Sequence, residues 1–247
     1  MIRPRRSLLF MPGSNARALE KARNLPADGI ILDLEDSVAP DAKALARDQI
    51  AKAISAGGFG KREVLIRVNS LDTPWWVDDV TMAGKARPDG ILVPKVSTVA
   101  DLNAIANRLS DINADMAIRV WAMLETARGV LDADKLAAAS KDSETRLAGF
   151  VFGPNDISRE TRIRMQPGRA AMIPMITSAR MSSSAQVLTA PWAGSGAAGT
   201  GVGDGLSVTS GTTVRSTFDF GLSFVMTGTP AAFAQTWSPL VTSDWTT

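Results

Sequence analysis

Short runs of apolar residues recur along the first two thirds of the chain, and segments with helical periodicity separate them. The clearest run follows Gly29, where three apolar residues lead directly into an acidic cluster of Asp33, Glu35 and Asp36. A short unbroken apolar run is typical of a strand covered on both faces, as in a parallel sheet. We therefore interpret residues 29–36 as a buried strand whose C-terminal end carries three carboxylates.

Six such runs occur at intervals of about 22 to 35 residues, with helical patterns between them. This alternation is typical of βαβ units in a parallel sheet. We predict an α/β fold, a TIM-type (β/α) barrel in which six βα units are legible. The expected strands are residues 7–13, 29–36, 63–69, 90–96, 118–126 and 147–156. The expected helices include residues 16–24, 40–56, 98–110 and 133–140.

Charged residues stand at the ends of the predicted strands. Arg67, Lys95, Glu125 and Asp156 follow later runs in the way that the acidic cluster follows the run after Gly29. The C-terminal ends of barrel strands meet at one mouth, which is where such barrels place their chemistry. A helix cap or a structural ion pair could explain any one of these residues. Five charged strand ends in succession favour a functional site.

Three neighbouring carboxylates repel one another, so a metal ion, an arginine or a lysine is expected beside the acidic cluster. Alternatively, one or two of these acids cap the next helix. The chain contains no Cys and no His, which excludes a thiolate nucleophile, a zinc–sulfur site and a Ser-His-Asp triad. Oxygen ligands point to Mg²⁺ or Mn²⁺ if a metal is bound.

The overall composition limits the classes of partner. The chain has 247 residues, of which 45% are hydrophobic, and this is enough for one barrel. A net charge of +2 gives no reason to expect a nucleic acid. No apolar run approaches the ~20 residues needed to span a membrane, and the basic start is followed by too short an apolar segment for a secretory signal. We expect a cytoplasmic protein without a membrane partner.

The chain changes character near residue 171. Residues 1–170 contain 47 charged side chains, whereas residues 171–247 contain only 5. We therefore divide the chain into an incomplete barrel domain, residues 1–170, and a low-charge tail rich in Ser, Thr and Gly, residues 171–247. A barrel of this type needs eight strands, so we expect its closing units to be missing or replaced. We also expect the first and sixth strands to keep unpaired edges.

Three interpretations of the tail compete. It is a flexible appendage, as the Gly-rich residues 194–205 suggest. It forms strands of its own, for which residues 212–220 and 221–227 are the candidates. The third interpretation, which the composition favours, is a reading frame that shifted near residues 171–176. The nucleotide sequence across codons 165–180 tests it, because no single-base change would restore a charged, helix-periodic sequence if the frame is native.

Six short motifs, in order, resemble the HpcH/HpaI aldolase and citrate lyase family, and most closely its citrate lyase β-subunit-like branch. They occupy residues 6–15, 31–38, 66–69, 93–95, 125–129 and 153–156. The resemblance extends over about residues 3–174. It implies a TIM-type barrel, a requirement for Mg²⁺, and cleavage or formation of a carbon–carbon bond. The implied substrate is a hydroxyacyl-CoA or a 2-keto or hydroxy acid, and the alternative activity is thioester hydrolysis at the same site. An inactive truncated barrel is the third hypothesis.

The resemblance also implies roles for individual residues. Glu125 and Asp156 match the family's metal-binding acids, and Glu125 also lies on the substrate side. Arg67 matches the arginine that holds the substrate carboxylate or the enolate oxygen, and Asp36 lies in the motif that supports the metal-bound waters. Lys95 is a further catalytic candidate, although a structural ion pair explains it equally well. The positions associated with substrate or CoA are Arg6 and Lys43. Relatives form trimers or hexamers, so we expect a homo-oligomer. The family's C-terminal His-containing segment has no counterpart here.

Overall fold

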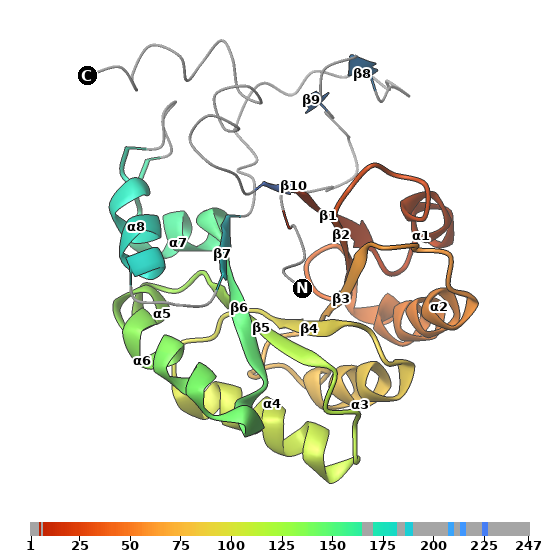
Figure 1. Cartoon of the computed structure of the whole chain (residues 1–247), viewed down its shortest axis with the longest axis horizontal. Helices are drawn as coiled ribbons and strands as arrows, with labels where there is room; N and C mark the ends of the chain where they lie inside the picture. The colour runs from red at the N-terminus through yellow and green to blue at the C-terminus, as the bar shows by residue number, and fades with distance from the viewer. Residues whose placement is uncertain are drawn as a thin grey trace.

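The computed structural model describes residues 5, 7–164, 170–181, 186–189, 207–209, 213–215 and 224–226. Its centre is a ring of strands, and the main helices lie outside this ring (Figure 1). Arg6 and the Gly-rich residues 194–205 lie outside the described residues. Within the described part of the chain, no helix is long and apolar enough to cross a membrane.

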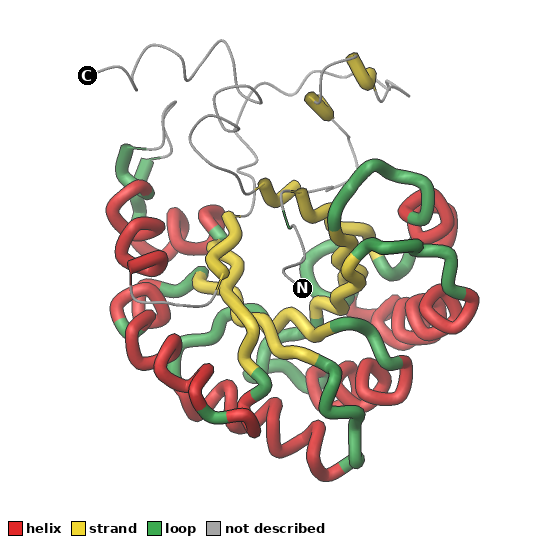
Figure 2. The backbone as a smooth tube through the Cα atoms, viewed as in Figure 1, coloured by secondary structure: helices red, strands yellow, loops and turns green. Residues whose placement is uncertain are grey.

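The six predicted strands form a continuous parallel arc in which each strand pairs with the next one in sequence. Ile31 of the second strand, for example, pairs with Phe10 of the first and Leu65 of the third. Figure 2 shows the strands in yellow, surrounded by the helices in red. The strands of the arc are β1 (Ser7–Pro12), β2 (Gly29–Asp33), β3 (Glu63–Arg67), β4 (Gly90–Val93), β5 (Arg119–Leu124) and β6 (Leu147–Phe152).

Two short strands join the ends of this arc. β7 (Gln186–Thr189) runs parallel to β6, and β10 (Phe224–Met226) runs antiparallel to both β1 and β7. The expectation of unpaired edges on the first and sixth strands is therefore wrong. The backbone N–H and C=O groups of an edge need partners. Short β-favouring segments after residue 171 provide these partners, although the sequence around them shows no helical periodicity that would have predicted further βα units.

The structure confirms the predicted α/β barrel and its six βα units, with two βα units of the usual barrel replaced at the closing side. The segments β8 (Ser207–Thr209) and β9 (Thr213–Arg215) form a separate antiparallel pair. β9 and β10 fall inside the two ranges that the tail's composition marked as candidate strands. The division at residue 170 and the reading-frame hypothesis remain predictions.

The helices follow the predicted ranges to within a few residues. Asn15 caps the first of them, because its Oδ1 accepts a hydrogen bond from the Ala18 N–H at 3.0 Å. The helices are α1 (Ala16–Ala22), α2 (Lys43–Ala56), α3 (Trp76–Ala86), α4 (Val99–Asp111), α5 (Ala127–Leu131), α6 (Ala133–Ala138), α7 (Pro154–Thr161) and α8 (Ile173–Met181), with 3₁₀ turns η1 (Pro40–Ala42), η2 (Ala139–Lys141) and η3 (Ser143–Thr145).

Two apolar layers hold these elements together. The larger layer lies between the strands and the helices, as expected for parallel strands that are buried on both faces. The smaller layer fills the inside of the ring and is made of Leu8, Phe10, Ile31, Leu65, Leu92, Trp121, Met123 and Val151. Because the interior is packed, the polar strand ends are confined to the mouth above it.

Candidate active site

The mouth of the barrel contains a paired arginine and aspartate at its base. Arg67 closes β3 and Asp33 closes β2, and these two residues are register partners. Arg67 donates from Nε to Asp33 Oδ1 at 2.6 Å and from Nη2 to Asp33 Oδ2 at 2.7 Å. Both side chains are buried. Such a bidentate contact fixes the guanidinium plane, so the two strand ends together give Arg67 a defined orientation.

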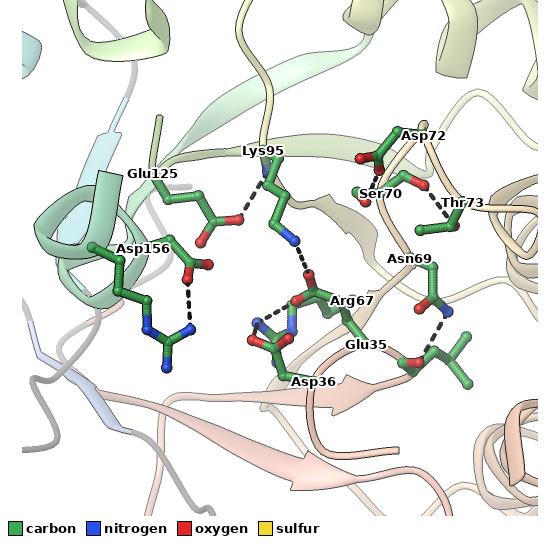
Figure 3. A network of polar contacts seen from close by, with 12 residues as sticks. Glu35, Asp36, Arg67, Asn69, Ser70, Asp72, Thr73, Lys95, Glu125 and Asp156 are labelled. Carbon is green, nitrogen blue, oxygen red and sulfur yellow. Dashed lines mark hydrogen bonds and ion pairs between the residues drawn. The ribbon is translucent and has the colours of Figure 1, made fainter. Parts of the chain in front are cut away.

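The rest of the acidic cluster faces the other side of the Arg67 guanidinium. Arg67 Nη1 lies 2.8 Å from Glu35 Oε2 and 3.8 Å from Asp36 Oδ2 (Figure 3). Glu35 is buried, whereas the Asp36 side chain is 66% exposed. The Phe10 ring lies 5.0 Å from the Arg67 guanidinium carbon. Arg67 is thus held between an aromatic ring below and carboxylates at its edges.

The charges in this cluster have opposite effects on its two buried acids. Burial raises the pKa of Asp33, but the charge and hydrogen bonds of Arg67 outweigh it, and the pKa is lowered. Ser37 adds to the lowering, since its hydroxyl donates to Asp33 Oδ2 at 2.5 Å. Burial also raises the pKa of Glu35, and there Arg67 does not offset it. Asp33 is thus a stable anion, whereas the Glu35 carboxylate is only partly neutralised by its neighbours.

Lys95 connects Glu35 to the acids of the next strands. Its backbone N–H donates to Glu125 Oε1 at 2.8 Å, and its Nζ lies 3.4 Å from Glu35 Oε1 (Figure 3). Burial lowers the pKa of Lys95, but the charge and hydrogen bond of Glu35, together with the charges of Asp156 and Asp36, more than offset this effect and the pKa is raised. The backbone has φ 54°, a left-handed conformation that is uncommon for a residue other than glycine. The surrounding structure holds this conformation at a point where it directs the N–H group at Glu125.

Glu125 and Asp156 are two acids at neighbouring strand ends, and burial disfavours the ionised form of Glu125. Glu125 is buried after the end of β5, and its pKa rises to about 8 because of burial and the nearby charges of Glu35 and Asp156. Asp156 lies in the first turn of α7 and has an ion pair with Arg159 at 3.3 Å. A Cβ added at Gly153 would lie 2.5 Å from Glu125 Oε2. The glycine therefore leaves the space that the Glu125 carboxylate occupies.

These acids provide oxygen ligands for a small hard cation. Among the described residues, no group of three or more His, Cys, Asp or Glu side chains could hold a metal ion by itself. Mg²⁺ needs only one or two carboxylates, because it keeps several of its water molecules. The raised pKa of Glu125 shows that burial and the neighbouring acids disfavour its ionised form, which a bound cation would favour. Glu125 and Asp156 thus fit a Mg²⁺ site in donor chemistry.

Lys43 lies behind the acidic cluster at the start of α2 and is buried. Its Nζ donates to the Leu34 and Glu35 carbonyl oxygens at 2.6 and 2.8 Å and to Asn69 Oδ1 at 2.7 Å. Burial lowers the pKa of Lys43, and the surrounding acids oppose this effect. All three N–H donors of the ammonium thus have acceptors within the chain. Its assigned contact with substrate or CoA stays a prediction.

The structure brings most of the predicted site residues to one mouth. These residues are Asp36, Arg67, Lys95, Glu125 and Asp156, of which Figure 3 shows the arrangement. Sequence reasoning did not identify Phe10, Gly153 or Asp79 as supports of the site. Phe10 and Gly153 lie inside motifs already noted, at a strand and at a strand end. Asp79 is fully buried on α3, and an acid inside a helix gives no signal of its own.

A comparison with family models finds a match to HpcH/HpaI aldolase/citrate lyase over residues 6–200. The chain is 44% identical over 169 residues to a (3S)-malyl-CoA thioesterase of Cereibacter sphaeroides. The match covers 68% of this chain and 55% of the relative. The chain is also 40% identical over 164 residues to an L-malyl-CoA/beta-methylmalyl-CoA lyase of the same species, with 63% and 50% covered. The chain thus spans about half the length of these curated relatives.

Solved structures share the fold. The citrate lyase beta subunit from Mycobacterium tuberculosis, complexed with oxaloacetate and magnesium, superposes with a TM-score of 0.60 at 24% identity, and the match covers 74% of this chain and 76% of that one. At this level of identity the likeness concerns the fold alone. It agrees with the parallel arc and with the helices outside it.

Proposed function

We propose that this chain, which belongs to the HpcH/HpaI aldolase/citrate lyase family, is a Mg²⁺-dependent carbon–carbon lyase acting on a hydroxyacyl-CoA thioester. The observation that carries the proposal is the pairing of two unlike groups at one mouth. One group is Arg67, oriented by Asp33, and the other is Glu125 with Asp156, two acids of which Glu125 has an ionised form that its surroundings disfavour. A fixed cationic fork beside a cation site suits a reaction that develops negative charge on oxygen.

Cleavage of such a substrate removes the hydroxyl proton and breaks the adjacent carbon–carbon bond. The hydroxyl carbon becomes the carbonyl of a keto acid or oxo acid, and the bonding electron pair moves onto the thioester fragment as an enolate. Protonation of the enolate carbon then gives the shortened acyl-CoA. Mg²⁺, when held by Glu125 and Asp156, would supply a Lewis acid for the developing oxygen charge.

The residues of the chain have distinct parts in this scheme. Arg67 would bind the substrate carboxylate or the enolate oxygen, and it stays cationic because Asp33 and its neighbours raise its pKa. Lys95 places a second positive charge beside Glu35 and orients Glu125 through its N–H group. Asp36, which is exposed at the mouth, is the candidate for contacts with ordered waters of the cation. Arg6 remains a candidate for the CoA side, whereas the Lys43 ammonium already donates to three acceptors within the chain.

A second candidate function is hydrolysis of the thioester at the same mouth. It is favoured by the names of relatives that are 44–45% identical to this chain, which are (3S)-malyl-CoA thioesterases. In this reaction water adds to the thioester carbonyl carbon, and the thiolate of CoA leaves. The same cationic groups would stabilise the negative charge on the carbonyl oxygen.

Product analysis with malyl-CoA and Mg²⁺ tests both candidates. The lyase reaction gives acetyl-CoA and glyoxylate, whereas hydrolysis gives malate and free CoA. The purified full chain is incubated with and without EDTA, and Glu125→Gln serves as the inactive control. Acetyl-CoA that depends on Mg²⁺ supports the lyase, and free CoA without glyoxylate assigns the thioesterase instead. The absence of both turnover and Mg²⁺ binding by calorimetry would contradict both and favour an inactive barrel.

A further inference from the structure

The acidic loop, residues 34–38, carries Glu35 and Asp36 to the mouth of the barrel, and buried side chains from two helices and one strand end support it from behind. We propose that Lys43, Asn69 and Asp79 are positioning residues, which set the place of this loop and thereby the contacts of Glu35 with Arg67 and Lys95. The inference rests on the proposed function, because it assigns these residues a part in organising that site.

Lys43 is the group that touches the loop directly. Its ammonium binds the carbonyl oxygens of two successive residues, Leu34 and Glu35, and a third acceptor on Asn69. The Trp75 ring lies 5.2 Å from Nζ and covers it on another side. The loop is irregular, and neither carbonyl group pairs with a strand. The Glu35 oxygen accepts from the Val38 N–H at 3.1 Å within the loop, and the Leu34 oxygen accepts from Asn69 Nδ2 at 3.0 Å. Lys43 is the one donor that bridges the two oxygens, and it binds the backbone of Glu35 from the side opposite to the mouth.

Asn69 is held in one orientation by Asp79. The Asp79 carboxylate only accepts hydrogen bonds, and its Oδ2 receives them from Asn69 N at 2.9 Å and Asn69 Nδ2 at 2.6 Å. Asn69 Nδ2 also donates to the Leu34 carbonyl oxygen at 3.0 Å. The amide oxygen must then point to Lys43. Asp79 therefore acts on the loop through Asn69 and, beyond it, Lys43.

Arg47 completes the network on the side away from the site. Its Nη1 donates to Asp79 Oδ1 at 3.0 Å, and it lies on α2 one turn beyond Lys43. Arg47 and Lys43 are thus two cations of the same helix that meet the same buried network at opposite ends. The Lys43 end supports the loop, whereas the Arg47 end contacts Asp79 and, at 3.7 Å, the exposed Asp78. The chain offers a matched pair for an experiment.

The arrangement is costly if it serves stability alone. Buried charges lose their hydration, and well-packed apolar side chains in their place are often equally or more stabilising. What an apolar replacement would not supply is the pair of directed donors for the Leu34 and Glu35 carbonyl groups. The side chain of Glu35 contacts both Arg67 and Lys95, so a displaced loop would change the two cationic groups that the proposed reaction uses.

The test compares Lys43→Met with Arg47→Met in the full chain. Both variants are assayed for kcat and KM with malyl-CoA, and hydrogen exchange is followed in the peptide that covers residues 33–38. For Lys43→Met we expect kcat to fall about 100-fold, the scale of a misplacement of about 1 Å, with KM changed less than about threefold. Exchange in the loop should accelerate. Arg47→Met, which leaves the contacts of Lys43 with the loop in place, should change both readouts much less than Lys43→Met does.

Two results would overturn the proposal. One is a large rise in KM with kcat retained in Lys43→Met, which would place Lys43 in contact with substrate. The other is loop exchange that is unchanged in Lys43→Met or equally faster in Arg47→Met. If the parent itself turns over no malyl-CoA, the proposed function fails, and the exchange comparison still decides the positioning role. If Lys43→Met does not fold, Asn69→Ala replaces it, with smaller changes expected in the same direction.

Discussion

Two sets of buried charge lie at the same mouth, and only one of them is balanced. Asp33 has a bidentate arginine, a serine hydroxyl and two backbone N–H groups as partners, and its pKa is lowered. Glu125 has a backbone N–H from Lys95, and its pKa is raised to about 8. In the first set, Asp33 is compensated by partners within the chain and holds the Arg67 side chain in place. In the second set, the ionised form of Glu125 lacks such compensation, and the proposed function gives it a cation from outside the chain.

The strongest test of this contrast is Glu125→Gln. We expect Mg²⁺-dependent turnover to be lost, because the variant removes the charge that the cation would compensate while keeping the shape of the side chain. The folded protein in metal-free buffer near neutral pH should be no less stable than the parent, since the raised pKa means that burial disfavours the carboxylate. Calorimetry with Mg²⁺ and urea denaturation measure the two effects. Equal Mg²⁺ affinity in variant and parent would remove Glu125 from the cation site.

Unlike Glu125→Gln, the variant Asp33→Asn should lower the stability of the folded protein. It leaves Arg67 charged and buried without its partner, a change that typically costs about 3–5 kcal/mol in stability. The pKa of Asp33 is lowered in the folded state, so its stabilisation is present above the ordinary pKa of an aspartate, about 3.9, and is lost as the pH falls below that value. Denaturation curves should therefore differ most near pH 7 and converge below about pH 4. A constant difference down to pH 3 would contradict this account.

Arg67→Lys tests whether the positive charge of Arg67 is enough for the reaction or whether the planar geometry of its guanidinium is also needed. Lysine keeps the positive charge but replaces the planar fork by a single ammonium. Loss of one well-placed donor to an oxyanion typically costs about 3 kcal/mol, or on the order of 100-fold in rate. The measurement is kcat/KM with malyl-CoA, and the melting temperature serves as the control for folding. Activity near that of the parent would exclude Arg67 from the mechanism.

The smallest expected effect is that of Gly153→Ala. The new methyl group would lie 2.5 Å from Glu125 Oε2 and 2.6 Å from Glu125 Cβ, so Glu125 must move. Overpacking of this kind typically costs about 1–3 kcal/mol. We expect weaker Mg²⁺ binding in calorimetry, and no further weakening when the change is added to Glu125→Gln. A full additional loss in the double variant would show that Gly153 acts independently of Glu125.

The regular alternation of apolar runs with helical patterns made it possible to predict the fold and most of the candidate site from the sequence. Arg67, Lys95 and Glu125 were recognisable because each charged residue follows an apolar run and parallel strands bring such ends together. The pairing of β7 and β10 with the arc was not recognisable, because no helical periodicity is evident in the sequence around these short strands. The hydrogen-bond network of Lys43, Asn69 and Asp79 behind the acidic loop could not be predicted from the sequence either. Lys43 and Asp79 lie on helices, where a charge ordinarily faces water, and only tertiary packing buries them.

The order of the strands around the ring has a consequence for synthesis. Each strand from β1 to β6 pairs with its neighbour in sequence, whereas closure of the ring joins β1 to β10 near the other end of the chain. The entropic cost of bringing chain segments together grows with the length of the loop between them, and domains generally form from the N-terminus as they leave the ribosome. We therefore expect the arc to assemble by local steps. Asp33, Arg67, Lys95, Glu125 and Asp156 would then meet before the closing strand has been translated.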